Sequence, residues 1–289
     1  MKSTATLIAI AIVALTLVSC SLFEPAEPET QRLAEHRVST STGVVQGQSS
    51  DQALVSWFDI PFAQPPVDDL RWKAPRTLNS PEQIIVARET KGCVQVASRY
   101  GGAEGEGVVG AEDCLYLDIR APADFAEKQY PVMFWIHGGG NTTGLKDFYD
   151  FSKMVVSQDV VVVTTNYRLS ALGWFTHPAI QGLQQGLDKS SNFGTLDLIE
   201  SLKWVQANIG QFGGDANNVT IFGESAGGHN VFTLLASPLA DGLFHRAISQ
   251  SGYTTSSSMA DAYNREGANQ LIERGSWQIV EQITNSASQ

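Results

Sequence analysis

The pentapeptide GESAG at residues 223–227 is the first place at which this sequence could perform chemistry. The spacing G-x-S-x-G is typical of a serine held on a tight turn between a strand and a helix. Glycines two residues on either side let the flanking chains pass without Cβ clashes, so the hydroxyl projects above the sheet. The strand-like VTIF at 219–222 precedes the turn, and a helix-compatible run follows it. We therefore predict that Ser225 is a nucleophile rather than an ordinary serine in a glycine-rich turn.

A second motif, HGGG at residues 137–140, could serve the same reaction. A glycine loop after a central strand can present backbone N–H groups to the negative charge of a tetrahedral intermediate. Glycine also lets the backbone approach the reacting oxygen closely. We predict that the oxyanion donors are the N–H groups of Gly139, Gly140 and Ala226. The alternative is a flexible glycine loop without this role.

A serine nucleophile needs a histidine base and an acid, and these follow the serine in chain order in this type of site. Only His229 and His245 follow Ser225. The first lies in the helix that leaves the turn and the second begins a strand-like segment, so we expect neither to be the base. Glu224 is next to the nucleophile, but consecutive side chains diverge, so we do not expect it to be the acid. We expect the two histidines outside the motifs to lie at the surface; these are His36 and His177.

Alternating apolar strands and helices must position these motifs. Wholly apolar runs of four or five residues indicate strands buried on both faces. Apolar residues at helical spacing indicate helices. We predict strands at 132–136, 160–163, 219–222 and 246–249, and helices at 196–209 and 227–235. This order predicts an α/β fold with a mostly parallel central sheet and helices on both faces.

The remaining segments give weaker signals. Short strand-like pieces occur at 44–45, 54–55 and 115–119. Prolines make 60–66 an extended loop. We expect a helix within 261–274 and polar coil at 285–289.

Composition limits the possible functions. The 289 residues are 43% hydrophobic and 17% charged, which is typical of a globular protein. The net charge is −11 and the sequence has no run of Lys or Arg, so we expect no nucleic-acid partner.

The N-terminus reads as an export signal. The apolar run LIAIAIVALTLV at 7–18 follows a single basic residue and is too short to span a membrane. It leads into LVSC, which resembles the lipobox of bacterial lipoproteins and implies cleavage before Cys20 and acylation of that cysteine. We therefore expect a signal peptide at 1–19, an acidic proline-containing tether at 20–37, and a membrane-anchored lipoprotein in the periplasm or on the cell surface. The alternative is an ordinary signal peptide whose end carries a cysteine by chance.

Two cysteines remain, Cys93 and Cys114, with a glycine-rich segment between them. Export to an oxidising compartment favours a disulfide. Closing a loop of this size is worth about 3 kcal/mol in the chain-entropy model. The alternative is two unpaired, buried thiols.

Residues 43–252 resemble the type-B carboxylesterase/cholinesterase family of α/β-hydrolases. The pieces that carry the resemblance are IPFAQPPVDDLRWKAP (60–75), EDCLYLDI (112–119), HGGG (137–140), NYRLSALGWF (166–175), FGGDANNVTIFGESAGG (212–228) and FHRAISQSG (244–252). The resemblance implies an α/β-hydrolase fold whose N-terminal portion is residues 38–289, with the C-terminal part missing. It also implies hydrolysis of small carboxylic esters through an acyl-serine intermediate.

The resemblance also implies several residue pairs, and the sequence differs from the family pattern at two places. It supports the Cys93–Cys114 pairing and implies that Arg71 pairs with Glu112 and Arg168 with Asp197. Asn141 stands where an aromatic residue, usually Phe, is common, so we expect a more polar pocket there. The segment between the cysteines contains no Trp, which disfavours a choline substrate.

The family's acid and histidine would lie beyond the matched portion. Two alternatives to an esterase therefore remain, a non-catalytic surface-anchored binding protein on an esterase scaffold and an inactive fragment. Neither the motifs nor the chemistry calls for a cofactor or a metal, so we expect none.

Overall fold

The structure is a computed structural model, and it describes residues 36–50, 53–86, 92–264 and 275–287. The unit that begins at His36 contains both predicted motifs. The predicted signal peptide, the lipidation site Cys20 and the tether up to residue 35 lie outside the described residues.

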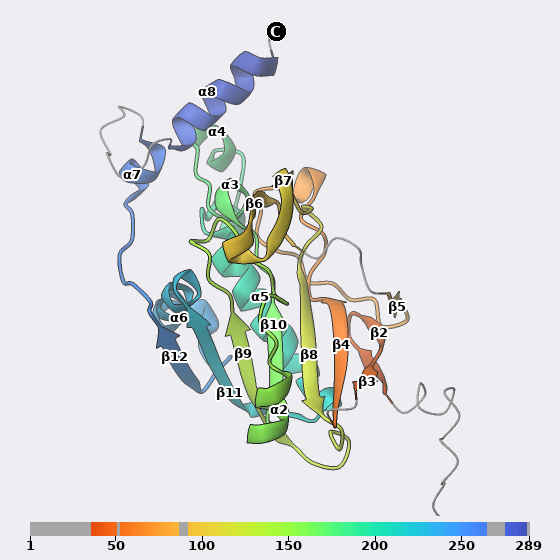
Figure 1. Cartoon of the computed structure of the whole chain (residues 1–289). Coiled ribbons are helices and arrows are strands. Elements are labelled where there is room, and N and C mark those ends of the chain that lie inside the picture. Colours follow the sequence, from red (N-terminus) through yellow and green to blue (C-terminus); the bar gives the residue numbers. More distant parts are fainter. Residues whose placement is uncertain (1–35, 51–52, 87–91, 265–274, 288–289) are drawn as a thin grey trace, which may run out of the picture. The chain divides into compact units, whose positions relative to one another are not determined.

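A seven-stranded sheet forms the centre of this unit (Figure 1). The strands, in sheet order, are β12 (Arg246–Gln250), β11 (Gly214–Glu224), β9 (Tyr130–Ile136), β10 (Val161–Thr165), β8 (Tyr116–Pro122), β4 (Leu54–Pro61) and β3 (Gln48–Ser50). The four strands from β12 to β10 pair in parallel, whereas β8, β4 and β3 pair antiparallel. The sheet is therefore mixed, and the prediction of a mostly parallel sheet holds for the half that carries the motifs. Antiparallel pairing is possible in the other half because those strands need no crossover helix between them.

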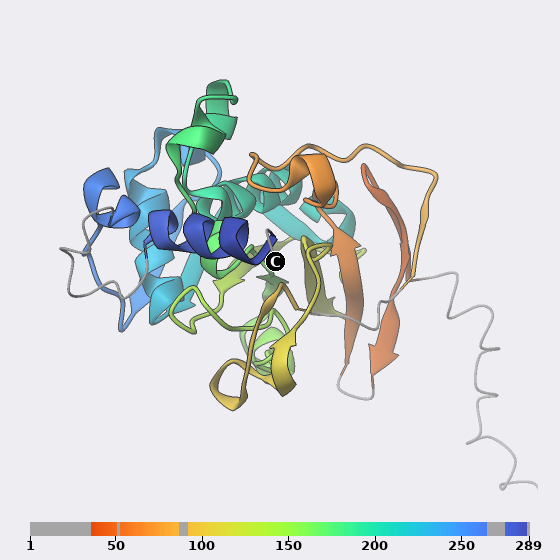
Figure 2. The same cartoon turned by 90° about the horizontal axis from the view of Figure 1, so that it is seen from above.

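Helices cover both faces of the sheet, as predicted (Figure 2). The teal helix α5 (Phe193–Asn208) and the helix α6 (Ala226–Ala236) lie on one face, and the green helix α2 (Ser152–Gln158) lies on the other. The pleat of β9 divides its side chains between the two faces. Phe134 and Ile136 join the large core under α5, whereas Met133 packs into the small core under α2. Each fully buried side chain of this kind contributes about 1.5–3 kcal/mol.

Smaller elements complete the unit. A three-stranded sheet contains β1 (Arg37–Thr40), β2 (Gly43–Gln46) and β5 (Ile84–Ile85). A hairpin of β6 (Gln95–Ser98) and β7 (Ala103–Val109) lies in the segment between the two cysteines. The other helices are α3 (Ser170–Gly173), α4 (Pro178–Gln181), α7 (Met259–Tyr263) and α8 (Ser276–Ala287), with five short 3₁₀ turns at 68–70, 99–101, 186–189, 209–212 and 238–240. Across the described ranges, no helix has the length and apolar character needed to cross a membrane.

β12 is the outermost strand of the sheet in the described part of the chain. Its Ile248 side chain is 46% exposed. The neighbouring helix α6 also leaves Phe232 and Leu235 exposed. Both outer strands of the sheet in the described residues, β12 and β3, are therefore partly exposed.

The C-terminal prediction was partly wrong. The capping box of Ser258 and Asp261 starts α7, which ends at Tyr263, and residues 265–274 of the predicted helix lie outside the described residues. Residues 285–287, predicted as coil, belong to α8. Apolar side chains such as Ile283 recur along this helix, and the hydroxyls of Thr284 and Ser286 bond to carbonyls three or four residues earlier, which makes polar residues compatible with a helix.

Candidate active site

Ser225 occupies a strained turn between β11 and α6. Its backbone has φ 56° and ψ −119°, a conformation that costs energy for any residue with a side chain. Its N–H donates to the carbonyl of Gln250 at 2.9 Å, which fixes the turn to the end of β12. The strand, turn and helix predicted for a nucleophile are therefore all present.

The two glycines of the motif are required by close packing of the backbone. A Cβ added at Gly227 would overlap the carbonyl oxygen of Ile136, the last residue of β9. A Cβ at Gly223 would lie 2.6 Å from the carbonyl of Gly227. The glycines on either side of Ser225 thus let α6 leave the sheet directly over β9, as the spacing predicts.

The HGGG loop lies directly against the nucleophile. β9 and β11 are parallel neighbours, and Ile136 pairs with Gly223, so both motifs leave the sheet at the same level. A Cβ at Gly138 would lie 3.3 Å from Cβ of Ser225. Gly139 has φ +98°, and a side chain there would overlap the carbonyl oxygen of Thr143. The loop therefore adopts a backbone path that only glycine allows.

The three predicted oxyanion donors are available for a ligand. Within the described residues, the N–H groups of Gly139, Gly140 and Ala226 donate to no acceptor. Ala226 is the first residue of α6, where N–H groups lack intrahelical partners and the helix dipole favours negative charge. Ala226 directly follows Ser225 and the glycine loop packs against Ser225 at Gly138, so these N–H groups are available to stabilise an oxyanion at this serine.

None of the five histidines in the sequence bonds to the Ser225 hydroxyl. His229 Nδ1 donates to the carbonyl of Tyr253 at 2.7 Å, and its ring stacks on that tyrosine. His245 Nδ1 accepts the N–H of Val219. His36 lies against Phe125. His229 and His245 thus have other partners, and that neither is the base stays a prediction.

His177 corrects the prediction of a surface residue. It is only 7% exposed, because its Nδ1 caps α4 by accepting the N–H of Ala179 and its ring packs against Trp277. A helix cap of this kind has a local structural role. Its burial depends on Trp277, a residue 100 positions further along the chain.

His137 is neutral and structural. Burial lowers its pKa to about 4. Its Nδ1 lies 2.9 Å from the carbonyl oxygen of Gly138, so Nδ1 carries the proton, and its ring stacks on Tyr167 with centroids 4.4 Å apart. It begins the oxyanion loop, and its single ring proton is engaged with the Gly138 carbonyl.

Side chains remote in sequence hold the oxyanion loop. The Tyr167 hydroxyl donates to the carbonyl of His137 at 2.7 Å. Asn141, at the other end of the loop, accepts a hydrogen bond from Asn230 Nδ2 at 2.9 Å. The polar residue expected at this departure from the family is therefore engaged with α6. Burial raises the pKa of Tyr167 above its usual value, so the hydroxyl remains a donor.

Gln95 joins the same loop to the disulfide segment. Cys93 and Cys114 form a disulfide, as predicted. Two residues on, the buried Gln95 accepts hydrogen bonds from the Thr143 hydroxyl at 2.7 Å and the Gly144 N–H at 2.8 Å, and its Nε2 donates to the Gly144 carbonyl. The disulfide therefore lies next to the residue that holds the C-terminal end of the oxyanion loop.

A buried ion cluster lies just beyond this loop. Lys146 Nζ is 2.7 Å from Asp118 Oδ1 and 2.9 Å from Asp59 Oδ1, and all three side chains are at most 3% exposed. Burial raises the pKa of Asp118, although Lys146 opposes that shift. The cluster ties the chain after the loop to β4 and β8.

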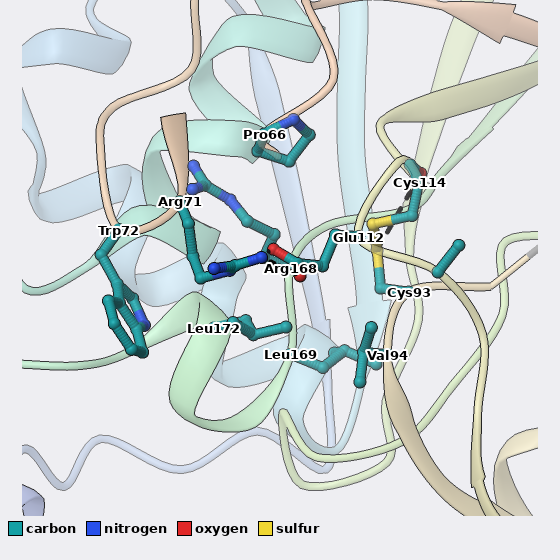
Figure 3. A pocket seen from close by; sticks show the side chains of 11 residues that line it. Pro66, Arg71, Trp72, Cys93, Val94, Glu112, Cys114, Arg168, Leu169 and Leu172 are labelled. Carbon is teal, nitrogen blue, oxygen red and sulfur yellow. Dashed lines mark hydrogen bonds and ion pairs between the residues drawn. A yellow bond between two sulfur atoms is a disulfide. The ribbon is translucent and has the colours of Figure 1, made fainter. Parts of the chain in front are cut away.

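The predicted arginine pairs are present. Arg71 forms a two-point ion pair with Glu112, with both distances 2.6 Å, and Arg168 forms a buried pair with Asp197 at 2.7 and 2.8 Å. Arg71, Glu112 and Arg168 line a small pocket together with the disulfide (Figure 3). The pocket contains neither Ser225 nor the glycine loop, and its guanidinium groups are already paired, so it is separate from the candidate chemistry. In the described ranges, no group of three or more His, Cys, Asp or Glu side chains is arranged to hold a metal ion.

Sequence reasoning did not identify the residues that position the site. They are Gln95, Tyr167, Asn230 and the Lys146 cluster. Tyr167 carried a signal, because it lies in the NYRL motif, four residues after the predicted strand at 160–163. The others lie far in sequence from the groups they hold and form no motif.

A serine on a strained strand-to-helix turn, facing a glycine loop with free N–H groups, is the nucleophile-elbow arrangement of the α/β-hydrolase fold. The chain belongs to the carboxylesterase family, whose sequence model matches residues 34–287.

Several characterised relatives are similar to this chain. It is 42% identical to the para-nitrobenzyl esterase of Bacillus subtilis (strain 168) over 218 residues, which are 74% of this chain and 43% of that protein. It is 39% identical to the fumonisin B1 esterase of Sphingopyxis macrogoltabida over 232 residues, which are 78% of this chain and 41% of that protein. The solved structure of a thermophilic PNB esterase superposes with a TM-score of 0.71 at 36% identity, over 81% of this chain and 49% of that one. The chain thus spans a little under half the length of these relatives.

Proposed function

We propose that this protein hydrolyses carboxylic esters through an acyl intermediate on Ser225. The observation that carries the proposal is the position of Ser225 at φ 56°, against a loop whose N–H groups are free. Membership of the carboxylesterase family supports it.

The reaction proceeds in two halves. The Ser225 hydroxyl adds to the ester carbonyl and loses its proton to a base, and the negative charge on the carbonyl oxygen is stabilised by the N–H groups of Gly139, Gly140 and Ala226. Collapse of this intermediate expels the alcohol, which takes up the proton, and leaves the acyl group on Ser225. Water then attacks the acyl-serine in the same way and releases the carboxylic acid.

The histidine base and its acid come, in this proposal, from residues that the present sequence does not contain. Two facts support this. All five histidines of the sequence have other contacts, and the relatives are more than twice as long as the matched region.

The substrate in this proposal is a small-molecule carboxylic ester. Two relatives are a para-nitrobenzyl esterase and a fumonisin B1 esterase, which supports an ester of this class. The segment between Cys93 and Cys114 contains no Trp to bind a quaternary ammonium group, so a choline ester is a poor candidate.

The proposal includes export and anchoring to a bacterial membrane by a lipid on Cys20. The lipobox-like LVSC and the apolar run before it support this. A disulfide between Cys93 and Cys114 is also suited to an oxidising compartment. The folded unit begins at His36, and Arg37 already pairs in β1, so the acidic tether ends before these two residues and would separate that unit from the membrane.

The test is hydrolysis of p-nitrophenyl acetate and butyrate by the protein expressed from its complete coding sequence. We expect turnover by the wild type and a fall of about 10⁶-fold in kcat for Ser225→Ala, as when a serine nucleophile is removed. A fluorophosphonate probe should label the wild type and not the variant. A wild type that neither turns over nor is labelled would contradict the proposal and favour the surface-anchored binding protein.

A further inference from the structure

Three consecutive glycines form the oxyanion loop, and none of them has a side chain by which it could be held. Glycine has the largest backbone freedom of any residue. Oxyanion donors accelerate a reaction only when they are already in place as charge develops. The position of Gly138–Gly140 must therefore be imposed from its two ends, His137 and Asn141.

At the C-terminal end, Asn141 is held from two sides. Its backbone has φ 57°, and its carbonyl accepts the N–H of Ser170 at 2.7 Å. Its side-chain Oδ1 accepts the Asn230 Nδ2–H at 2.9 Å. Asn230 is only 2% exposed and lies in α6, five residues after Ser225. One hydrogen bond thus joins the loop to the helix that carries the nucleophile.

At the N-terminal end, the same network continues. Tyr167, which is fully buried, donates its hydroxyl to the carbonyl of His137 at 2.7 Å and also lies 3.3 Å from Asn141 Oδ1. The two ends of the glycine loop therefore meet at one hydroxyl, and Asn230 connects this group to α6. A phenylalanine side chain at position 141 would have no oxygen to accept the bond from Asn230.

We propose that Asn141 and Asn230 are positioning residues whose hydrogen bond fixes the oxyanion N–H groups relative to the Ser225 hydroxyl. The proposal rests on the proposed hydrolase function. Neither side chain has a part in bond making or breaking. Their role is to keep Gly139 and Gly140 at the distance from Ser225 that the tetrahedral intermediate requires.

The test uses Asn230→Leu, which is close in size, Asn141→Gly, which tolerates the positive φ, and the double variant. Steady-state kinetics with p-nitrophenyl acetate gives kcat and KM for each. Losing one such bond should lower kcat about three- to tenfold, with KM changed less than about twofold, because the bond matters most in the transition state. The double variant should fall no further than the lower single variant, because both changes remove the same bond.

Hydrogen exchange on the same samples measures the loop without turnover. The N–H groups of Thr142 and Thr143 both bond to the Gly139 carbonyl at 3.0 Å, so they report the closed loop. They should exchange faster in all three variants. Val231→Ala is the matched control, because Val231 is fully buried in α6 next to Asn230 and makes no bond to the loop. It should lower the melting temperature and leave kcat and the exchange of these two amides unchanged.

The proposal is overturned if Asn230→Leu behaves like Val231→Ala, with a lower melting temperature and unchanged exchange and kcat. Turnover that is absent in the wild type would count against the proposed hydrolase function alone. The exchange rates would still decide whether Asn141 and Asn230 hold the loop.

Discussion

The turn that carries Ser225 and the glycine loop that faces it are held by different means. The turn is fixed by backbone packing, because Gly223 and Gly227 fit against each other and against Ile136 with no room for a Cβ. The loop is fixed by side chains from distant parts of the chain, above all Gln95 and Asn230. One half of the site is thus specified locally and the other half by tertiary contacts.

This difference predicts different responses to mutation. The backbone segments of the turn are in direct contact, so adding even a methyl group there should abolish the site. Hydrogen-bonding side chains each contribute a modest amount, so the loop should loosen in steps. Three changes test the contrast.

The largest effect should come from Gly227→Ala. The new methyl group would overlap the Ile136 carbonyl oxygen, which cannot move without separating β9 from β11. We expect no detectable esterase activity and an unfolding free energy lower by about 3 kcal/mol or more, measured by urea denaturation. Gly210→Ala is the control, because a Cβ there has open space. Equal stability of the two variants would contradict the role given to backbone packing.

Lowering the pH should reduce the unfolding free energy, because His137, the first residue of the HGGG loop, is buried and neutral. The pKa of His137 is about 4 in the folded protein, against 6.5 for an ordinary histidine. Between these values the unfolded chain binds a proton that folded His137 does not, so stability is complete above pH 6.5 and falls as the pH drops towards 4. The loss from this one group is up to about 3 kcal/mol.

Urea denaturation between pH 4.5 and 7.5 measures this dependence. The variant His137→Phe keeps a ring against Tyr167 and cannot titrate, so its stability should change less over the same range. Parallel curves for the two proteins would show that His137 does not cause the loss.

The smallest effect should come from Thr143→Val. It removes the hydroxyl that donates to Gln95 but leaves the Gly144 N–H on the same acceptor. We expect a loss of about 1 kcal/mol in unfolding free energy, because one donor to a buried acceptor is gone. Thr284→Val on the exposed side of α8 should change stability by less than about 0.5 kcal/mol. A loss as large as that of Gly227→Ala would mean that the loop does not loosen in steps.

The same contrast explains what could be predicted from sequence. The turn at Ser225, the glycine loop and the strands before them depend on residues next to each other in the chain, and all were predicted at the right places. The Asn141–Asn230 bond joins residues 89 positions apart, and the bond from the Gly144 N–H to Gln95 joins residues 49 apart. No local pattern marks either partner, so sequence reasoning could not find them.

The burial of His177 and the C-terminal end of α8 were also missed, again because both depend on contacts that no local pattern shows. His177 is polar and follows no apolar pattern, yet Trp277 covers it. The polar residues at the end of α8 have low intrinsic preference for helix, but their hydroxyls find acceptors within it. The antiparallel half of the sheet was missed because short strands without helices between them do not reveal their direction.

The hydrogen bond from the Ser225 N–H to the Gln250 carbonyl ties the nucleophile to the register of β12. β12 pairs in parallel with β11, with Glu224 opposite Gln250. A slip of β12 by one residue along β11 would move this carbonyl away from the Ser225 N–H and release the turn. The geometry of the nucleophile therefore depends on the correct pairing of the outermost described strand.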